Sequence, residues 1–264
     1  MTSTGDPSGL NGKNSVRILF LGQCLNYGYD GVKRASTFPS LAATALSARF
    51  PSVKFKFDSK FLYHPTGLKT LLHHRLLFSK PDIVVISLPA MFAATTWRVN
   101  RIYEIAPELV DTARTFMRRI QAKVRGLDPA IAPAKTLLDA AFTTRPPLSL
   151  PEYERLVEIA VLHAQQISCC RIVLMGPGEF NEDTLEEYEF HSPELWHNVN
   201  RMIMNLASRL DVPFINAQEV LEEYGSEVFM DRNHRFSLYG HEVIAKEVAG
   251  VLAGQIAALT CSEV

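Results

Sequence analysis

The sequence predicts an α/β protein: a three-layer α/β/α sandwich built on a mostly parallel, five-stranded sheet. Two observations lead to this prediction. Short runs of β-branched and other apolar residues recur along the chain, and segments with helical apolar spacing separate them. Strands that alternate with helices favour right-handed crossovers, which cover both faces of a parallel sheet with helices. With 264 residues, 47% of them apolar, the chain is long enough to bury such a core.

Five segments have the composition of strands. Residues 16–21 (VRILFL) form a continuous apolar run that ends at Gly22, as in a strand buried on both faces. Residues 82–88 (DIVVISL) and 171–175 (RIVLM) are the clearest central strands. Residues 53–57 alternate apolar residues with lysine, which predicts a more exposed strand, and residues 213–215 predict a short fifth one.

Helices are predicted between and after these strands, from apolar residues that recur about every three or four positions. The segments concerned are 40–49, 68–77, 100–124, 152–167, 194–210 and 238–259.

These elements predict a single domain over residues 16–260. Residues 1–15 are polar and lack the apolar stretch of a signal peptide, so we expect a disordered tail. The segment around 126–151 interrupts the alternation with five prolines, at 129, 133, 146, 147 and 151. A lid over a binding cleft and a plain surface excursion both account for such an insertion.

Composition argues against several classes of function. A formal net charge of −1 gives no sign of nucleic-acid binding, and no apolar run reaches the length of about 18 residues that a membrane span needs. The four cysteines lack the spacing of a disulfide framework, which favours a reducing compartment and a cytoplasmic location.

The most informative stretch is Asp231-Arg-Asn-His234, which lies just before the last predicted helix. A carboxylate three residues from an imidazole can orient the ring, and an oriented histidine activates a nucleophile as a general base. His241 lies seven residues further on, in the first turns of that helix, and is a weaker candidate.

Cys24 supplies a nucleophile, because it follows the first predicted strand directly. Ligands of open α/β sheets bind beyond the carboxyl ends of the strands. A thiol beside a histidine and near a helix N-terminus has a lowered pKa and is nucleophilic. The alternative is a buried structural cysteine, the usual role of a free one.

No metal or cofactor is predicted. His64, the pair His73-His74 and the pair Cys169-Cys170 lack the spacings of metal ligands, and no phosphate-binding glycine motif occurs.

Taken together, these residues resemble the SGNH (GDSL-type) hydrolase superfamily, a group with a flavodoxin-like α/β/α fold. Its members carry a Gly-Asp-Ser-Leu block after the first strand and an Asp-x-x-His block before the last helix. This chain has Gly22-Gln23-Cys24-Leu25 at the first place and Asp231 to His234 at the second. The resemblance implies that Cys24 is the nucleophile, His234 its base and Asp231 the residue that orients the base. It also implies that the backbone N–H groups of Cys24 and Gly67 form the oxyanion hole.

The sequence departs from the family at its Gly-x-Asn block, whose asparagine is another oxyanion donor. Pro89-Ala90-Met91 follows the third strand here, and methionine donates no hydrogen bond. Asn26 is one residue that could replace the missing donor, and Met91 would then line the substrate site.

The resemblance implies an acyl hydrolase or acyltransferase, with esterase or thioesterase chemistry, that forms an acyl-enzyme on Cys24. Its substrate would be a small acyl compound, free or attached to a carrier. The alternative is a catalytically inactive binding protein with the same fold, since a fold alone does not establish chemistry. The sequence does not predict the oligomeric state.

Overall fold

A parallel five-stranded sheet forms the centre of the molecule in a computed structural model, which describes residues 15–28, 31–94, 97–100, 142–178, 193–230 and 235–261. The strand order is β2-β1-β3-β6-β7, and every neighbouring pair is parallel. The predicted fold class is therefore confirmed. The strands are β1 (Ser15–Gly22), β2 (Lys54–Phe61), β3 (Ile83–Ser87), β6 (Arg171–Met175) and β7 (Phe214–Ile215).

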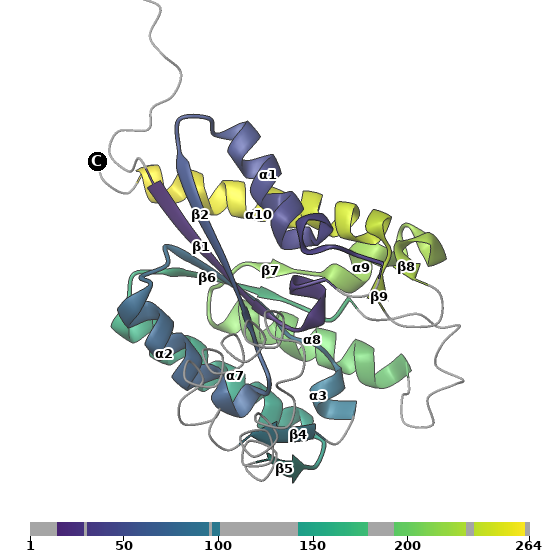
Figure 1. Cartoon of the computed structure of the whole chain (residues 1–264). Coiled ribbons are helices and arrows are strands. Elements are labelled where there is room, and N and C mark those ends of the chain that lie inside the picture. Colours follow the sequence, from purple (N-terminus) through teal and green to yellow (C-terminus); the bar gives the residue numbers. More distant parts are fainter. Residues whose placement is uncertain are drawn as a thin grey trace, which may run out of the picture.

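Helices cover both faces of this sheet, as Figure 1 shows. Two of them pack together on one face, namely α1 (Phe38–Arg49) and α10 (Leu238–Cys261). The other face carries α2 (Leu68–Phe78), α7 (Leu150–Ile167) and α8 (Pro193–Arg209). None of the helices in the described ranges is long and apolar enough to span a membrane.

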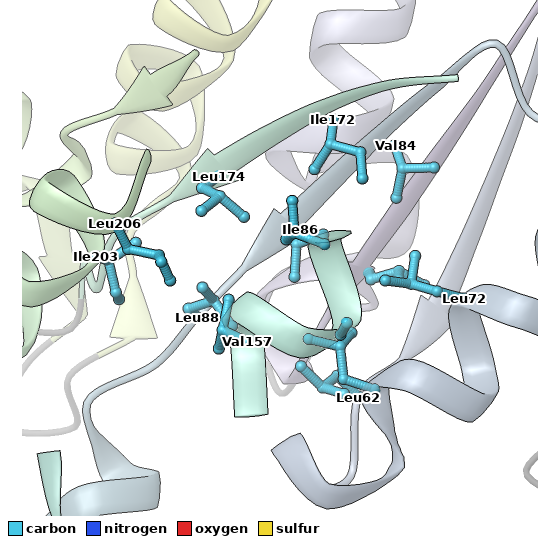
Figure 2. Close-up of a cluster of buried hydrophobic side chains, with 14 of the residues drawn as sticks. Leu62, Leu72, Val84, Ile86, Leu88, Val157, Ile172, Leu174, Ile203 and Leu206 are labelled. Atoms are coloured by element: carbon cyan, nitrogen blue, oxygen red, sulfur yellow. The ribbon is translucent and has the colours of Figure 1, made fainter. Parts of the chain in front are cut away.

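The sheet separates two hydrophobic cores. Side chains of β3 and β6 alternate between them, so that Val84, Ile86 and Ile172 face the α2/α7/α8 side. Figure 2 shows this core, in which Val157 of α7 and Ile203 of α8 meet Leu174 and Leu88. Ile83, Val85 and Val173 belong to the core under α1 and α10. Burial on both faces explains why these strands are continuous apolar runs.

Most predicted bounds agree with the structure to within two residues, and two differences have physical reasons. β2 continues to Phe61, whereas the prediction stopped at residue 57. It is an edge strand with largely half-buried residues, so the polar stretch 58–60 is tolerated within it. Asn100, expected to begin a helix, instead ends β4 (Trp97–Asn100), which pairs with β5 (Phe142–Arg145). The remainder of the helix predicted over 100–124 lies outside the described residues.

The part of the predicted insertion that the structure describes contains regular structure. β5 is followed by a short link without regular structure that contains Pro146 and Pro147, and Pro151 lies in the first turn of α7. Proline is compatible with that position because a first-turn N–H has no partner within the helix. Ser149 caps this helix by accepting a hydrogen bond from the Glu152 N–H at 3.4 Å.

Small elements that the sequence analysis did not predict lie near the carboxyl ends of the strands. They are α3 (Met91–Ala94), α9 (Ala217–Glu222) and the antiparallel pair of β8 (Phe229–Met230) and β9 (Arg235–Phe236). Two-residue strands are too short to produce a periodic pattern in the sequence.

A buried histidine joins α10 to α1. His241 is 0% exposed, and its Nδ1 accepts a hydrogen bond from the Phe38 backbone N–H at 3.1 Å. Its ring stacks on Phe38 and meets Phe236 of β9 edge to face, with centroids 6.1 and 5.3 Å apart. His241 therefore has a structural role: it is neutral, it satisfies the first N–H of α1, and it is not the free base that its position near His234 suggested.

Burial lowers the pKa of His241 to about 4, so this residue should make the stability of the protein depend on pH. In the unfolded chain His241 binds a proton near pH 6.5, whereas in the folded protein it does so only near pH 4. The contribution of the neutral His241 to the free energy of unfolding is therefore complete above pH 6.5. It is lost as the pH falls towards 4, a change on the order of 3 kcal/mol. We expect urea unfolding between pH 7 and 4.5 to show a flatter pH profile in His241→Asn, whose amide oxygen can still accept from Phe38. Equal slopes in the two proteins would contradict this assignment.

Candidate functional site

The predicted site residues that the structure describes follow neighbouring strands at one edge of the sheet. Cys24 begins the 3-10 turn η1 (Cys24–Asn26) directly beyond β1, while its side chain lies outside the described part of the structure. Gly67 ends η3 (Pro65–Gly67) after β2, and Met91 begins α3 after β3. These segments share the carboxyl edge of the sheet, where open α/β sheets bind ligands.

Asn26 is held against the end of β1. It is 1% exposed, and its backbone N–H donates to the Gln23 carbonyl at 3.0 Å. A Cβ atom on Gly22 would lie 2.4 Å from the Asn26 Nδ2, so only glycine at position 22 leaves room for this amide. Neither polar atom of the amide has a hydrogen-bond partner among the described residues. A buried amide without partners costs about 1–3 kcal/mol, so its presence here calls for an explanation, and a functional role is one.

The N–H of Gly67 is already engaged. It donates to the His64 carbonyl at 3.1 Å, which closes the turn η3. The buried His64 caps this turn, since its Nδ1 accepts from the Thr66 backbone N–H at 3.4 Å and contacts the Thr66 Oγ1 at 2.9 Å. The predicted use of Gly67 as an oxyanion donor therefore requires that an acyl oxygen compete with the His64 carbonyl.

The segment after β3 is packed rather than open. Pro89 accepts a hydrogen bond from the buried Tyr153 hydroxyl at 3.1 Å, and Phe92 contacts both Tyr153 and His64 edge to face. Met91 is half-buried and packs against the core under α2 and α7. This region holds its backbone in place but offers no side-chain amide to a substrate.

Asp231 and His234 lie outside the described residues, but both flanks of the segment 231–234 are described. Met230 ends β8, and a Cβ atom on Gly31 would lie 3.0 Å from its Cε atom. Phe236 of β9 lies so close to Gly178, just after β6, that a Cβ there would be 2.7 Å from its ring. Gly31 follows η1 in the chain, so the two flanks contact the loops that follow β1 and β6.

Three aromatic rings lie next to η1. The Tyr27 ring lies 5.9 Å from that of Phe61, and the Phe61 ring lies 4.6 Å from that of Tyr63. We call these three residues the aromatic row. Phe61 and Tyr63 lie two positions apart at the end of β2. Tyr27 is distant from them in the sequence and meets them because β1 and β2 are neighbours in the sheet. No local sequence pattern therefore indicates this contact.

The other histidines and cysteines considered in the sequence lie elsewhere. His73 Nδ1 contacts His163 Nε2 at 3.0 Å between α2 and α7, and burial, Lys69 and His73 lower the pKa of His163. Cys169 is exposed and Cys170 buried just before β6, at the opposite end of that strand, and burial raises the pKa of Cys170 to about 11. The described residues contain no group of three potential metal ligands.

Comparison with known proteins relates the chain to solved structures by fold. No protein-family model matches the sequence, and no curated protein matches it. A lipase/acylhydrolase from Enterococcus faecalis aligns over 91% of this chain and 96% of its own, with a TM-score of 0.58 and 14% identity. This chain has the fold of lipases and esterases.

Two further structures agree. Axe2, an acetylxylan esterase from Geobacillus stearothermophilus, covers 88% of this chain and 92% of its own, with a TM-score of 0.54 and 18% identity. Its catalytic mutants replace a serine, a histidine and an aspartate three residues before that histidine. A putative lipolytic protein of the G-D-S-L family from Desulfitobacterium hafniense covers 89% and 99%, with a TM-score of 0.51 and 10% identity. At these identities the likeness concerns the fold.

The contact between Gly22 and Asn26 leads to a stability prediction. Gly22→Ala should destabilise the protein by roughly 1–3 kcal/mol, because the new methyl group displaces the Asn26 amide or the backbone. The atoms that it meets all belong to the Asn26 side chain, so the double variant Gly22→Ala/Asn26→Ala should lose most of that penalty. Urea unfolding of the parent, the two single variants Gly22→Ala and Asn26→Ala, and the double variant measures the coupling free energy between the two positions.

Gly250→Ala in α10 is the matched control. No atom lies within 4 Å of a Cβ at that position, and alanine favours the helix by up to about 1 kcal/mol. Additive effects of the changes at positions 22 and 26 would contradict the proposed contact.

Proposed function

We propose that this chain is an acyl hydrolase or acyltransferase that cleaves an ester or thioester bond through an acyl-enzyme on Cys24. His234 accepts the thiol proton while the sulfur attacks the acyl carbon. The same proton then passes to the departing alcohol or thiol. Water or another acceptor next attacks the thioester, gives its proton to His234 and releases the acyl group, and the thiol is restored. Asp231 orients the histidine and stabilises its protonated form.

One observation carries this proposal: the contacts of the β8–β9 pair. Residues 231–234 connect β8 to β9 in the chain, and both ends of that connection touch loops at the carboxyl edge of the sheet. Met230 contacts the loop after η1, which begins with Cys24, and Phe236 contacts the loop after β6. β8 and β9, which flank Asp231 and His234 in the chain, thus both contact loops at the carboxyl edge, and this supports a site shared by Cys24 and His234.

The solved structures with this fold support the same chemistry. The acetylxylan esterase has catalytic mutants at a serine, a histidine and an aspartate, with the aspartate three residues before the histidine. Asp231 and His234 have the same spacing in this chain. Cysteine in place of serine gives a better nucleophile at neutral pH and a thioester intermediate, which also favours transfer to acceptors other than water.

On the oxyanion side, we propose the backbone N–H of Cys24 and the side-chain amide of Asn26 as donors, with Gly67 as a further one. The buried Asn26 amide lies two residues from Cys24 and has no hydrogen-bond partner among the described residues. The Asn26 amide would replace the oxyanion donor of the asparagine that this chain lacks after β3. We propose Met91, which stands in that region, as an apolar contact for the acyl group. The substrate is then a small acyl compound, free or carrier-bound, and the proposed location is cytoplasmic.

The competing proposal is a non-catalytic binding protein with this fold. The packed segment Pro89 to Phe92 and the engaged N–H of Gly67 favour it, because both leave the oxyanion side poorer in donors. The two proposals differ in the reactivity of Cys24, and this difference can be tested directly.

Turnover of a panel of short- and long-chain 4-nitrophenyl esters and acyl thioesters should depend on Cys24. We expect Cys24→Ala and His234→Ala each to lower kcat by about 10⁴-fold or more, since residues that act as one unit fail together. Iodoacetamide should also modify Cys24 faster in the parent than in His234→Ala. Cys169→Ala, which removes an exposed thiol elsewhere, is the control and should keep the parental rate. Parental rates in Cys24→Ala, or no turnover of any ester by the parent, would refute the enzyme proposal.

Asn26→Leu should separate activity from stability. The leucine has nearly the shape of asparagine but no donor, so we expect kcat to fall about 10²–10³-fold with little change in KM. Because the change removes a buried amide without partners, stability against urea should stay equal or increase. A variant that keeps its kcat would exclude Asn26 as an oxyanion donor. Gln23→Leu removes the other buried side-chain amide beside Cys24, whose Nε2 also lacks a partner among the described residues, and shows whether the loss of kcat is specific to Asn26.

A further inference from the structure

The aromatic row of Tyr27, Phe61 and Tyr63 has the geometry of a recognition surface. Neighbouring rings are tilted by 44° and 51°, with centroids 5.9 and 4.6 Å apart, which are favourable arrangements for aromatic pairs. All three residues are half-buried, so part of each remains accessible. Tyr27 is the first residue after η1, and Phe61 is the last residue of β2.

The register of the sheet places this row beside the proposed nucleophile. Phe61 pairs with Gly22, and neighbouring strands lie about 4.8 Å apart. Cys24 lies two residues after Gly22, and Tyr63 lies two residues after Phe61. Phe57, four residues before Phe61 on the same strand, packs against the core under α1 and α10, the side that also holds Phe236. Since side chains alternate along a strand, Phe61 faces the same side of the sheet as the β8–β9 pair.

Arg34 fixes one end of the row. Its guanidinium carbon lies 5.5 Å from the centroid of Tyr27, within the range of a cation–π contact. Tyr27 thus has Arg34 and Phe61 as neighbours, and this restricts its ring before any ligand binds. A restricted surface loses less conformational entropy on binding.

We propose that the aromatic row binds an aromatic ring carried by the substrate, so that the protein prefers aryl-bearing esters over linear ones. This inference rests on the proposed function, because it assigns the row to the ester cleaved at Cys24. A substrate ring placed against Tyr63 extends the series of tilted ring contacts and gains an interaction beyond the area that it buries. A linear alkyl chain of similar size gains the area alone.

Two pairs of matched substrates distinguish the acyl side from the alcohol side. Benzyl acetate and hexyl acetate differ in the alcohol, whereas ethyl 3-phenylpropanoate and ethyl hexanoate differ in the acyl group. We expect KM to favour the aryl member of one pair by about two- to tenfold. Tyr63→Leu should abolish that preference and Tyr63→Phe should keep it. Phe57→Leu, which changes a ring of the same strand away from the row, should leave both KM and kcat unchanged.

Binding of the free products tests the row without turnover. In saturation-transfer NMR, benzyl alcohol or 3-phenylpropanoate should bind more strongly than hexanol or hexanoate, and Tyr63→Leu should remove the difference. A protein that binds the aryl compound through Tyr63 but turns over no ester would refute the proposed function and keep the row as a ring-binding site. Equal KM values within both pairs, or an aryl preference that survives in Tyr63→Leu, would overturn the inference.

Discussion

The hydrogen bond from the Phe38 amide to His241 joins the parts of the molecule on which the proposed site depends. It links the first residue of α1 to the first turn of α10, and the His241 ring also contacts Phe236 of β9. Phe38 in turn meets Phe20 of β1 edge to face. One buried, neutral imidazole therefore connects the strand that leads to Cys24 with the strand that follows residues 231–234. Loss of this junction would loosen both sides of the site together.

Around this junction, the site combines a tightly packed frame with buried side-chain amides, among them that of Asn26, whose polar atoms lack partners among the described residues. Glycine at positions 22, 31 and 178 allows close approach by Asn26, Met230 and Phe236, so side chains from distant segments meet at the strand ends. The Asn26 amide is buried there without a partner among the described residues, a cost that packing alone does not require. We interpret it as a donor held ready for a developing negative charge, because preorganised donors stabilise such charge without reorganisation.

The sequence predicted the elements whose burial is regular and missed those that depend on tertiary contacts. β1, β3 and β6 are apolar runs because helices cover both of their faces, and their bounds were predicted to within one residue. The length of β2, the turn α3 and the β8–β9 pair were not predicted, since edge exposure and two-residue strands leave weak patterns. The role of His241 could not be read from its neighbours, because its partner Phe38 is 203 residues away. The roles of Cys24, Asp231 and His234 remain predictions.

The central claim is that the Cys24 thiol becomes acylated. Intact-mass spectrometry of the protein, quenched in acid milliseconds to seconds after mixing with an activated 4-nitrophenyl ester, tests it most directly. The account predicts one acyl group per chain, located on Cys24, which neutral hydroxylamine removes as it removes thioesters. The group should be absent from Cys24→Ala, and in Cys24→Ser it should resist neutral hydroxylamine as an ordinary ester. A parent protein that gains no acyl mass, or a Cys24→Ala protein that gains the same mass, would contradict the claim.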